Sequence, residues 1–248
     1  MSLYKHHYRG VILAGGSGTR MGLLTAATNK HLLPLGDYPL LVHSVYKLLF
    51  QGIETITVVT SPEAMGPITR LLAALKLTID IDLAVQKEPG GIAQALTLAD
   101  RPGDRRNIAV LLGDQVFEDD LNRALELHLN RAHGPGCTLV LKTVHNPKAY
   151  GVAVYEDGKL ASVEEKPEKP LSSFAVTGVY LYDPTVFERC RSAPVSARGE
   201  QEITSVNNGY ISQNLCQTIL LPGYWTDAGT PETWWLANQL VRARAPAF

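Results

Sequence analysis

A glycine-rich stretch near the N-terminus combines the residue types that hold phosphate groups. It reads Gly15-Gly16-Ser17-Gly18-Thr19-Arg20 and directly follows the apolar run 11–14. Glycine tolerates a positive φ, so such a loop can bring several backbone N–H groups close to an anion. Arg20 and the later Lys30 add one fixed and one mobile positive charge. The combination predicts a site for a nucleoside triphosphate, although the loop alone also fits a tight strand-to-helix turn with a surface arginine.

Two well-known phosphate-binding loops do not fit this spacing. The dinucleotide fingerprint G-x-G-x-x-G, counted from Gly16 and Gly18, places Met21 where its third glycine belongs. The ATPase loop needs a lysine directly after a glycine, and the stretch 15–22 contains none. The mismatches argue against a nicotinamide-dependent oxidoreductase and a P-loop ATPase.

The elements around this loop have the pattern of an α/β fold. Short apolar runs rich in β-branched residues alternate with helical patterns, which indicates a mostly parallel sheet covered by helices. In the first half we expect strands over 11–14, 55–60, 79–85 and 108–112, and helices over 39–50, 62–76 (N-cap Ser61) and 119–132 (closing on Gly134). In the second half we expect antiparallel strands over 152–155 and 159–163 around the turn Asp157-Gly158, and helices over 184–191, 201–212 and 231–244.

The topology predicts one cleft for residues that are far apart in the chain. Ligands of such sheets bind outside the carboxyl ends of the parallel strands. The glycine loop follows the first expected strand, 86–91 follows the third, and Asp114 ends the fourth. No linker, repeat or low-complexity segment interrupts the chain. We therefore expect one domain over 1–248, with a nucleotide-binding half over about 10–135 and a sugar-binding half over about 136–240.

Composition sets limits on the partners. The 248 residues carry a formal net charge of −1, with 45% hydrophobic and 19% charged residues. These ordinary values give no reason to expect nucleic acid or an anionic membrane as a partner. The apolar run after the basic N-terminal residues is far too short for a signal peptide or a membrane span. We therefore expect a cytoplasmic protein in which local charge does the binding.

The three cysteines are Cys137, Cys190 and Cys216. They are an odd number, widely scattered, and contain no C-x-x-C pair, which argues against a disulfide framework and against a zinc site. We expect reduced thiols in the core or on the surface.

A series of motifs in a fixed order resembles the sugar-nucleotide pyrophosphorylase family, and within it the shorter bacterial glucose-1-phosphate thymidylyltransferases. The resemblance runs from about Gly10 to Leu240. The motifs are GGSGTR at 15–20, Thr25, NKHLLP at 29–34, GGIAQA at 90–95, LGD at 112–114, YGV at 150–152, EEKP at 164–167, VTG at 176–178, SARGE at 196–200, EIT at 202–204 and WTDAGT at 225–230.

The resemblance implies a three-layer, Rossmann-like fold with a mixed, mostly parallel sheet. It also implies an Mg²⁺-dependent enzyme that transfers a thymidylyl group from dTTP to glucose 1-phosphate, giving dTDP-glucose and pyrophosphate. Arg20 and Lys30 would hold the phosphates that leave as pyrophosphate. The residues implied to bind the nucleotide are Leu13, Gly15, Gly16, Gly18, Thr19, Gln86, Pro89 and Gly91, where the Gln86 amide can pair with thymine or uracil.

Asp114 and Asp227 align with the metal-binding aspartates of the family. Mg²⁺ prefers one or two carboxylates together with phosphate oxygens, which suits transfer between two polyanions. Taken singly, Asp114 also fits a turn at a strand end, and Asp227 an Asx turn before Gly229.

The sugar-binding residues are implied by the second half of the motif series. Lys166 would hold the sugar phosphate, and Glu165 would accept hydrogen bonds from sugar hydroxyls. Without the resemblance, both also fit a solvated charge run over 164–169. The other residues implied to bind the sugar are Leu112, Gln115, Tyr150, Gly151 and Val176.

The implied mechanism is an ordered, in-line displacement at the α-phosphorus without a protein nucleophile. A sugar phosphate is already mostly ionised near neutral pH, so no strong general base is needed. UTP differs from dTTP by one methyl group, which an apolar pocket discriminates by only about 1 to 3 kcal/mol. UTP, another hexose 1-phosphate, or a binding-only homologue therefore stay open as alternatives.

Three positions depart from the family pattern. Leu23 replaces a usual proline, Gln115 an asparagine, and Ser205 an aspartate. The chain also ends soon after its last expected helix, so we do not expect an allosteric site built by a C-terminal extension. Homo-oligomers (dimers or tetramers) are usual in this family, and Trp234-Trp235 fits either an interface or the core.

Overall fold

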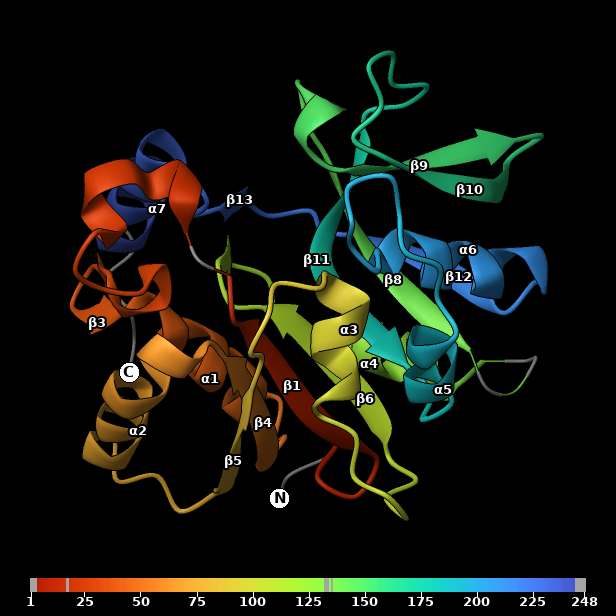
Figure 1. The fold of residues 1–248 in the computed structure, drawn as a ribbon. Helices are drawn as coiled ribbons and strands as arrows, with labels where there is room; N and C mark the ends of the chain where they lie inside the picture. The colour runs from red at the N-terminus through yellow and green to blue at the C-terminus, as the bar shows by residue number, and fades with distance from the viewer. Residues whose placement is uncertain (1–3, 17, 132–133, 135, 244–248) are drawn as a thin grey trace.

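A nine-stranded mixed sheet carries both halves of the protein (Figure 1). The computed structural model describes residues 4–16, 18–131, 134 and 136–243. The main path of the sheet has the order β10-β9-β11-β6-β1-β4-β5, and β8 and β12 extend it from β11. Its strands are β1 (Tyr8–Ala14), β4 (Thr55–Thr60), β5 (Asp80–Val85), β6 (Asn107–Leu112), β8 (Cys137–Thr143), β9 (Gly151–Glu156), β10 (Lys159–Glu165), β11 (Phe174–Tyr182) and β12 (Cys216–Leu220).

The strands of the first half are parallel and those of the second half are mixed. β1 lies between β4 and β6 in parallel register, and β4 continues to β5 in the same direction. β11 then pairs antiparallel with β6, β8 and β9. The carboxyl ends of β1, β5 and β6 therefore meet at one edge of the sheet, which is where ligands bind in open α/β folds.

Helices cover both faces of the sheet, which gives three layers. They are α1 (Leu40–Phe50), α2 (Pro62–Ala74), α3 (Ile92–Thr97), α4 (Asn122–Leu129), α5 (Val186–Arg191), α6 (Ile203–Ser212) and α7 (Pro231–Ala243). Side chains of α3, α5 and α6 pack on one face of the sheet, and those of α1, α2 and α4 pack on the other. Alternation along β1 serves both layers, because Val11 and Leu13 face the first core and Ile12 faces the second.

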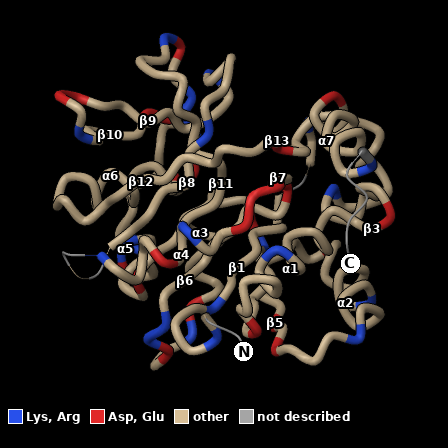
Figure 2. Tube along the Cα trace, turned by 180° about the vertical axis from the view of Figure 1, so that it is seen from behind, with Lys and Arg blue, Asp and Glu red and all other residues tan. Residues whose placement is uncertain are grey.

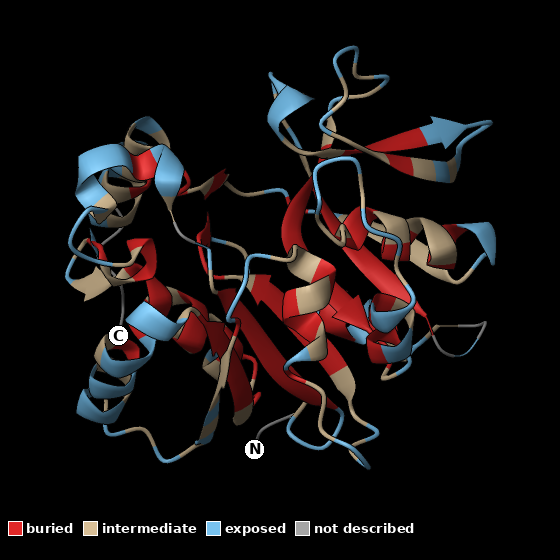
Figure 3. Ribbon diagram, in the orientation of Figure 1, coloured by how far each residue is buried: buried red, intermediate tan, exposed pale blue. Residues whose placement is uncertain are grey.

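Burial follows this layering (Figure 3). The central strands are buried along most of their length, whereas the outer surfaces of α2 and α7 and the tip of the β9–β10 hairpin are exposed. Lysine, arginine and acidic residues alternate around the outside of the molecule (Figure 2). The mixed distribution agrees with the formal net charge of −1.

The expected α/β fold is confirmed, with corrections at some elements. All four strands expected in the first half and the hairpin strands are present within a few residues. The expected helix over 119–132 is shorter, because Asp120 accepts a hydrogen bond from the backbone N–H of Asn122 at the helix start. This helix ends at Leu129 and does not close on Gly134. Residues 132 and 244, the last residues of two expected helices, lie outside the described residues.

Two further findings differ from the expected elements. Ser61 occupies the N-cap of α2, but only its carbonyl bonds to the helix, and its side chain makes no capping hydrogen bond. The strands β8, β11 and β12 and the short α3 were not anticipated. β8 and β11 are mostly buried because both faces of the sheet are covered there, so they lack the polar alternation that marks a half-exposed strand. β12 is a partly buried edge strand that includes Gln217 and Thr218, and α3 has only 6 residues.

A short antiparallel ladder carries the second half of the chain back to the first. It pairs β7 (Gln115–Phe117) with β13 (Trp225–Asp227). A smaller ladder pairs β2 (Pro34–Leu35) with β3 (Tyr38–Pro39). The segment before β13 is fixed by Lys142 of β8, whose Nζ donates to the carbonyl oxygens of Leu221 (3.1 Å), Pro222 (3.2 Å) and Gly223. The backbone N–H of Gly223 also donates to Asp119 (2.9 Å).

We expect Lys142→Met to lower the free energy of unfolding by about 1–3 kcal/mol, because three carbonyl groups lose a charged donor. Urea denaturation measures the loss. Lys159→Met, at an exposed position of the hairpin, is the matched control and should stay within about 0.5 kcal/mol of the unmodified protein. Equal stability of the two variants would contradict the importance of the Lys142 contacts.

Candidate active site

Two neighbouring cavities lie at the carboxyl ends of the parallel strands. The loop cavity is lined by Leu13, Gly15, Gly16, Lys30, His31, Gln86, Pro89, Gly91, Ile92, Ala95, Leu112, Asp114 and Glu200. The hairpin cavity is lined by residues of the second half together with Arg20, Ile92, Leu112, Asp114 and Gln115 of the first half. Ile92, Leu112 and Asp114 therefore form a wall that both cavities share.

The loop cavity is shaped by glycines that stand against a fixed glutamine. A Cβ atom at Gly15 would clash with Oε1 of Gln86, so glycine leaves room for this amide in its present orientation. Nε2 of Gln86 donates to Oε1 of Gln94 at 2.7 Å, which sets the orientation of the Gln86 amide. Gly91 has a φ of 96°, and a Cβ there would lie 2.5 Å from the carbonyl oxygen of Gln201. The cavity thus presents one oriented amide between close backbone segments.

His31 stands in the same cavity as a neutral ring. Burial, followed by the charge of Lys30, lowers the pKa of His31 to about 3. Its Nδ1 lies 2.7 Å from Oδ1 of Asn29, and a Cβ at Gly113 would lie 2.7 Å from the ring. Sequence reasoning quoted His31 only as part of a motif and gave it no role. Its burial shows that it packs against the glycine before Asp114.

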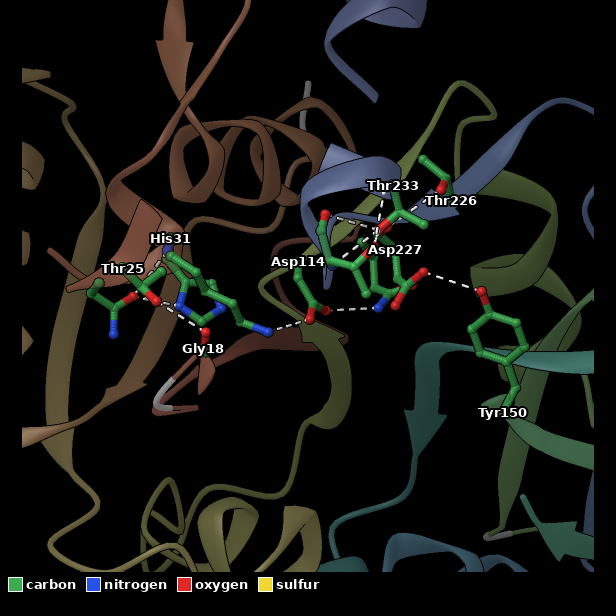
Figure 4. Close-up of polar contacts among 12 residues, drawn as sticks. Gly18, Thr25, His31, Asp114, Tyr150, Thr226, Asp227 and Thr233 are labelled. Atoms are coloured by element: carbon green, nitrogen blue, oxygen red, sulfur yellow. Dashed lines mark hydrogen bonds and ion pairs between the residues drawn. The ribbon is translucent and has the colours of Figure 1, made fainter. Parts of the chain in front are cut away.

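Asp114 is a buried carboxylate whose two oxygens are both engaged (Figure 4). Oδ2 accepts a hydrogen bond from Nζ of Lys30, and Oδ1 accepts one from Nε2 of Gln115 at 2.8 Å. Burial raises the pKa of Asp114, but the nearby Lys30 outweighs it and holds that pKa well below its usual range. Asp114 is therefore charged at neutral pH and pairs with an equally buried lysine.

Asp227 comes to this place through the β7–β13 ladder. Its Oδ1 accepts a hydrogen bond from the Tyr150 hydroxyl at 3.1 Å, as Figure 4 shows. Burial, followed by the charge of Asp114, raises the pKa of Asp227, while Tyr150 and Arg20 oppose the shift. A Cβ at Gly229 would lie 2.7 Å from Oδ2 of Asp227 and 2.9 Å from a guanidinium nitrogen of Arg20. Arg20 and Asp227 are thus direct neighbours.

The two carboxylates fit a divalent cation. Both line the hairpin cavity, and the charge of Asp114 helps to raise the pKa of Asp227, an effect that a cation between the two carboxylates would relieve. Among the described residues no cluster of three or more histidine, cysteine or acidic side chains is found. Two protein oxygens with the remaining positions left to phosphate and water are the donor set that Mg²⁺ accepts.

The far side of the hairpin cavity holds a second network of charges. Glu165 accepts a hydrogen bond from the Thr204 hydroxyl at 2.6 Å and forms ion pairs with Lys166 (3.5 Å) and Arg198 (3.4 Å). Lys166 has a φ of 46°, unusual for a residue with a side chain, and its N–H donates to the Tyr150 carbonyl at 3.0 Å. The hydrogen bond holds the Lys166 backbone at the rim, where its ammonium group is exposed.

The wall between the two networks is formed by Gln115 and Trp225. Nε1 of Trp225 donates to Oε1 of Gln115 at 2.8 Å and to the carbonyl oxygen of Thr177 at 3.2 Å. The Trp225 ring also packs edge-on against Tyr150 at 5.1 Å between centroids. Gln115 therefore links Asp114 to the aromatic side chain of Trp225. An asparagine at this position would have to make the same link with one methylene fewer.

The structure brings most residues predicted for the site to these two cavities. Leu13, Gly15, Gly16, Lys30, Gln86, Pro89 and Gly91 line the loop cavity, Arg20, Gln115, Tyr150, Gly151, Glu165, Lys166, Val176 and Asp227 line the hairpin cavity, and Leu112 and Asp114 line both. Gly18 and Thr19 line neither cavity. Ser17 lies outside the described residues. Gly18 supports the loop from behind, because its carbonyl accepts the Thr25 hydroxyl at 3.0 Å.

Several lining residues had no role in the sequence prediction. Besides His31 they include Ile92, Thr204, Asn207 and Trp225. Ile92, Thr204 and Trp225 stand inside motifs of the resemblance, which was the signal available for them. Asn207 lies on α6 outside those motifs, and only the packing of this helix brings it to the cavity.

Two of the three positions that depart from the family pattern, Leu23 and Ser205, lie away from the cavities, whereas Gln115 lines the hairpin cavity. Leu23 is 92% exposed. The hydroxyl of Ser205 donates to the carbonyl oxygen of Glu202, and Ser205 lines neither cavity. Of the tryptophan pair, Trp234 packs against the core under α7 and donates to the Pro34 carbonyl, whereas Trp235 is 59% exposed.

Comparison with known proteins identifies the family. A family model described as nucleotidyl transferase matches residues 9–244. The chain belongs to the nucleotidyl transferase family. It is 41% identical over 240 residues to a glucose-1-phosphate thymidylyltransferase of Mycolicibacterium smegmatis, covering 94% of this chain and 82% of that protein. A relative with the same name from Neisseria meningitidis is 37% identical, with 91% and 79% covered.

Comparison with solved structures shows the same fold. A Bacillus anthracis protein assigned as a glucose-1-phosphate thymidylyltransferase, solved with sucrose, superposes with a TM-score of 0.90 and 42% identity, and 97% of each chain is covered. A UDP-glucose pyrophosphorylase solved with UDP-glucose gives a TM-score of 0.84 at 20% identity, which shows a shared fold. The resemblance inferred from the motifs is confirmed. In the described part of this nucleotidyl transferase, no helix has the length and apolar character to cross a membrane.

The neutral state of His31 predicts a pH dependence of stability. The pKa of His31 is about 3 in the fold and about 6.5 in an unfolded chain, so the unfolded state takes up the proton first as pH falls. His31 therefore makes unfolding easier as pH drops from about 6.5 toward 3, by at most about 1.4 kcal/mol per pH unit. We expect the free energy of unfolding of His31→Gln to fall less steeply between pH 6 and pH 4.5.

Urea denaturation across this pH range measures the two slopes. His6→Gln is the matched control, because His6 is exposed, and it should keep the slope of the unmodified protein. If His31→Gln also keeps that slope, the result contradicts the presence of a buried, neutral His31 in the folded protein.

Proposed function

We propose that this nucleotidyl transferase moves the thymidylyl group of dTTP to glucose 1-phosphate, forming dTDP-glucose and releasing pyrophosphate. The supporting observation is the shared wall, in which Asp114 borders a cavity with an oriented amide and glycines and a cavity with acidic and hydroxyl groups. A nucleotide on one side and a sugar phosphate on the other would meet beside this carboxylate. The names of the relatives agree with these two substrates.

The loop cavity is the proposed nucleotide site. Gln86 would read the base, because its amide offers both a donor and an acceptor and is held by Gln94. Lys30 would leave its hydrogen bond to Asp114 and bind the phosphates instead. Arg20, which lies near Asp227, would bind the same phosphates. A planar guanidinium and a mobile ammonium together fit the phosphates that leave as pyrophosphate.

The hairpin cavity is the proposed sugar site. Glu165 is fixed by Thr204 and by its ion pairs, so its carboxylate can accept hydrogen bonds from sugar hydroxyls in a defined geometry. Lys166 stands at the rim with a mobile charge for the sugar phosphate. Tyr150 and Trp225 form an apolar wall for the ring.

The reaction needs little covalent chemistry from the protein. An oxygen of glucose 1-phosphate attacks the α-phosphorus in line, and the bond from that phosphorus to pyrophosphate breaks. Near neutral pH the attacking phosphate is mostly ionised, so no proton has to be removed from it. Arg20, Lys30 and Lys166 would orient the two anions and stabilise the charge on the equatorial and leaving oxygens. Asp114 and Asp227 would hold Mg²⁺, which when bound supplies positive charge to the phosphates.

A grid of nucleoside triphosphates and hexose 1-phosphates tests the substrates. Pyrophosphate release is followed with Mg²⁺ present, and the products are identified by mass. We expect the highest rate with dTTP and glucose 1-phosphate, and with UTP a rate about 10- to 200-fold lower, because one methyl group separates the two. If another pair of substrates gives the highest rate, the assignment of dTTP and glucose 1-phosphate is wrong. If no pair releases pyrophosphate, the result favours a homologue that only binds sugar nucleotides.

We expect Asp227→Asn to lower kcat/KM by about 100-fold or more, because the neutral amide no longer balances a cation at the α-phosphate. Asp114→Asn should have at least this effect, but it also leaves Lys30 without its buried partner, so Asp227→Asn is the cleaner variant. Pyrophosphate release with varied Mg²⁺ and a thermal melt are measured together. Asp157→Asn, in the exposed hairpin turn, is the control and should behave as the unmodified enzyme.

We further propose that the protein forms a homo-oligomer, either a dimer or a tetramer. The supporting observation is the exposed apolar face of α7, where Trp235 is 59% and Leu236 46% exposed. Light scattering after size-exclusion chromatography gives the mass directly, and a mass of one chain at micromolar concentration would contradict the proposal.

A further inference from the structure

Two of the three cysteines, far apart in the chain, are neighbours in the sheet. β12 pairs with β8 in parallel, and the first rung of this ladder joins Cys216 to Cys137. In a parallel ladder, residues in register point to the same face of the sheet, and neighbouring strands lie roughly 4.8 Å apart. Cys137 belongs to the core packed under α3, α5 and α6, and the partly buried Cys216 packs against that core. All three cysteines are free thiols, as expected, but these two are adjacent in the sheet although they are far apart in the sequence.

The spacing of this rung is compatible with a disulfide. Disulfides form between residues whose Cα atoms lie about 4.4–6.8 Å apart, a range that includes neighbouring strands. The usual distance between the Cβ atoms is nearer 3.8 Å, so bonding would draw the ends of the two strands together. The resulting bond would be easier to reduce than a relaxed structural disulfide.

The two thiols differ in access and in surroundings. Cys137 is buried, whereas Cys216 is partly exposed and begins β12, whose ladder partner among the described strands is β8 alone. Burial, followed by the neighbouring Cys216 thiol, raises the pKa of Cys137, while the charge of Arg131 lowers it. Arg131 is held at this place by a hydrogen bond to the Cys137 carbonyl at 2.8 Å. Access makes Cys216 the thiol that meets a reagent first, and Cys137 the one that reacts second.

We propose that Cys137 and Cys216 form a reversible disulfide by exchange with a small-molecule disulfide. The Cys216 thiolate attacks one sulfur of the small disulfide, whose S–S bond breaks and releases one small thiol. Cys137 then gives up its proton and attacks Sγ of Cys216, which releases the second small thiol. Two protein thiols are oxidised and one small disulfide is reduced to two thiols, so atoms and electrons balance.

The inference is independent of the proposed reaction. The rung lies at the start of β8, whereas Leu141, four residues further along β8, pairs with Val176 of the hairpin cavity. The cysteine pair is thus separated from the cavities along the strand, and the test needs no measurement of turnover.

Thiol counting on the folded, full-length protein tests the proposal. The folded protein is incubated with oxidised glutathione and is then unfolded in urea that contains N-ethylmaleimide, so that buried free thiols are blocked as well. The intact mass and the cross-linked peptides are then determined. Of the three cysteines, we expect only Cys190 to be blocked, together with a peptide pair joining Cys137 to Cys216. Dithiothreitol should restore all three thiols.

Three variants separate this outcome from nonspecific oxidation. Cys190→Ser removes the buried thiol of α5 and should still form the disulfide. Cys216→Ser should form none and keep Cys137 and Cys190 free. Cys137→Ser should stop at a stable mixed disulfide of glutathione on Cys216, because the second thiol is missing.

The proposal is overturned if all three thiols of the unmodified protein react with N-ethylmaleimide after native incubation. It is equally overturned if glutathione stays on Cys216 while Cys137 is present, or if the cross-link contains Cys190. Because Cys216→Ser changes a partly exposed residue, its folding does not depend on filling a core position, and it keeps the test decisive should Cys137→Ser not fold.

Discussion

The site depends on one buried ion pair, between Asp114 at the end of β6 and Lys30 behind the glycine loop. Two charges withdrawn from water are stable only if each is paired and hydrogen-bonded. Asp114 meets this condition through Lys30 and Gln115, and it lies in the wall between the two cavities. Removing either partner would leave an uncompensated charge in the interior. The same pair gives the site a lysine that incoming phosphates can bind. It also gives the site a carboxylate on which a cation can take the place of that lysine.

The remainder of the fold brings the second half of the chain to this pair. The mixed sheet places β9, β10 and β11 beside the parallel strands, so the hairpin cavity opens next to the loop cavity. The β7–β13 ladder then returns Asp227 to the neighbourhood of Asp114, and the backbone N–H of Ala228 donates to the Asp114 carbonyl at 2.8 Å. Lys142 and Asp119 fix the segment before β13. Asp227 and Gln115 therefore stand on a rigid ladder, whereas Arg20 and Lys30 lie on short 3₁₀ helices.

Sequence carried the prediction of the fold and of most cavity residues because the motifs stand at strand ends, where topology brings them together. Gln86 and Asp114 were placed in this way, whereas Glu165 was named only from the resemblance. Periodicity and turn chemistry missed what long-range packing decides: the early end of α4, the neutral His31, and the strands buried on both faces. The Cys137–Cys216 rung was equally hidden, because parallel register between distant strands leaves no local pattern in the chain. Gly18 and Thr19 were expected at the ligand from their motif, yet they line neither cavity.

The most direct test of the central claim is a crystal structure of the protein with dTDP-glucose, the proposed product that spans both cavities. The account predicts the thymine ring against Gln86 in the loop cavity, the glucose against Glu165 in the hairpin cavity, and the diphosphate beside Asp114. A product bound with both its base and its sugar in one cavity, or with the diphosphate away from Asp114, would contradict the assignment of the shared wall as the reaction centre.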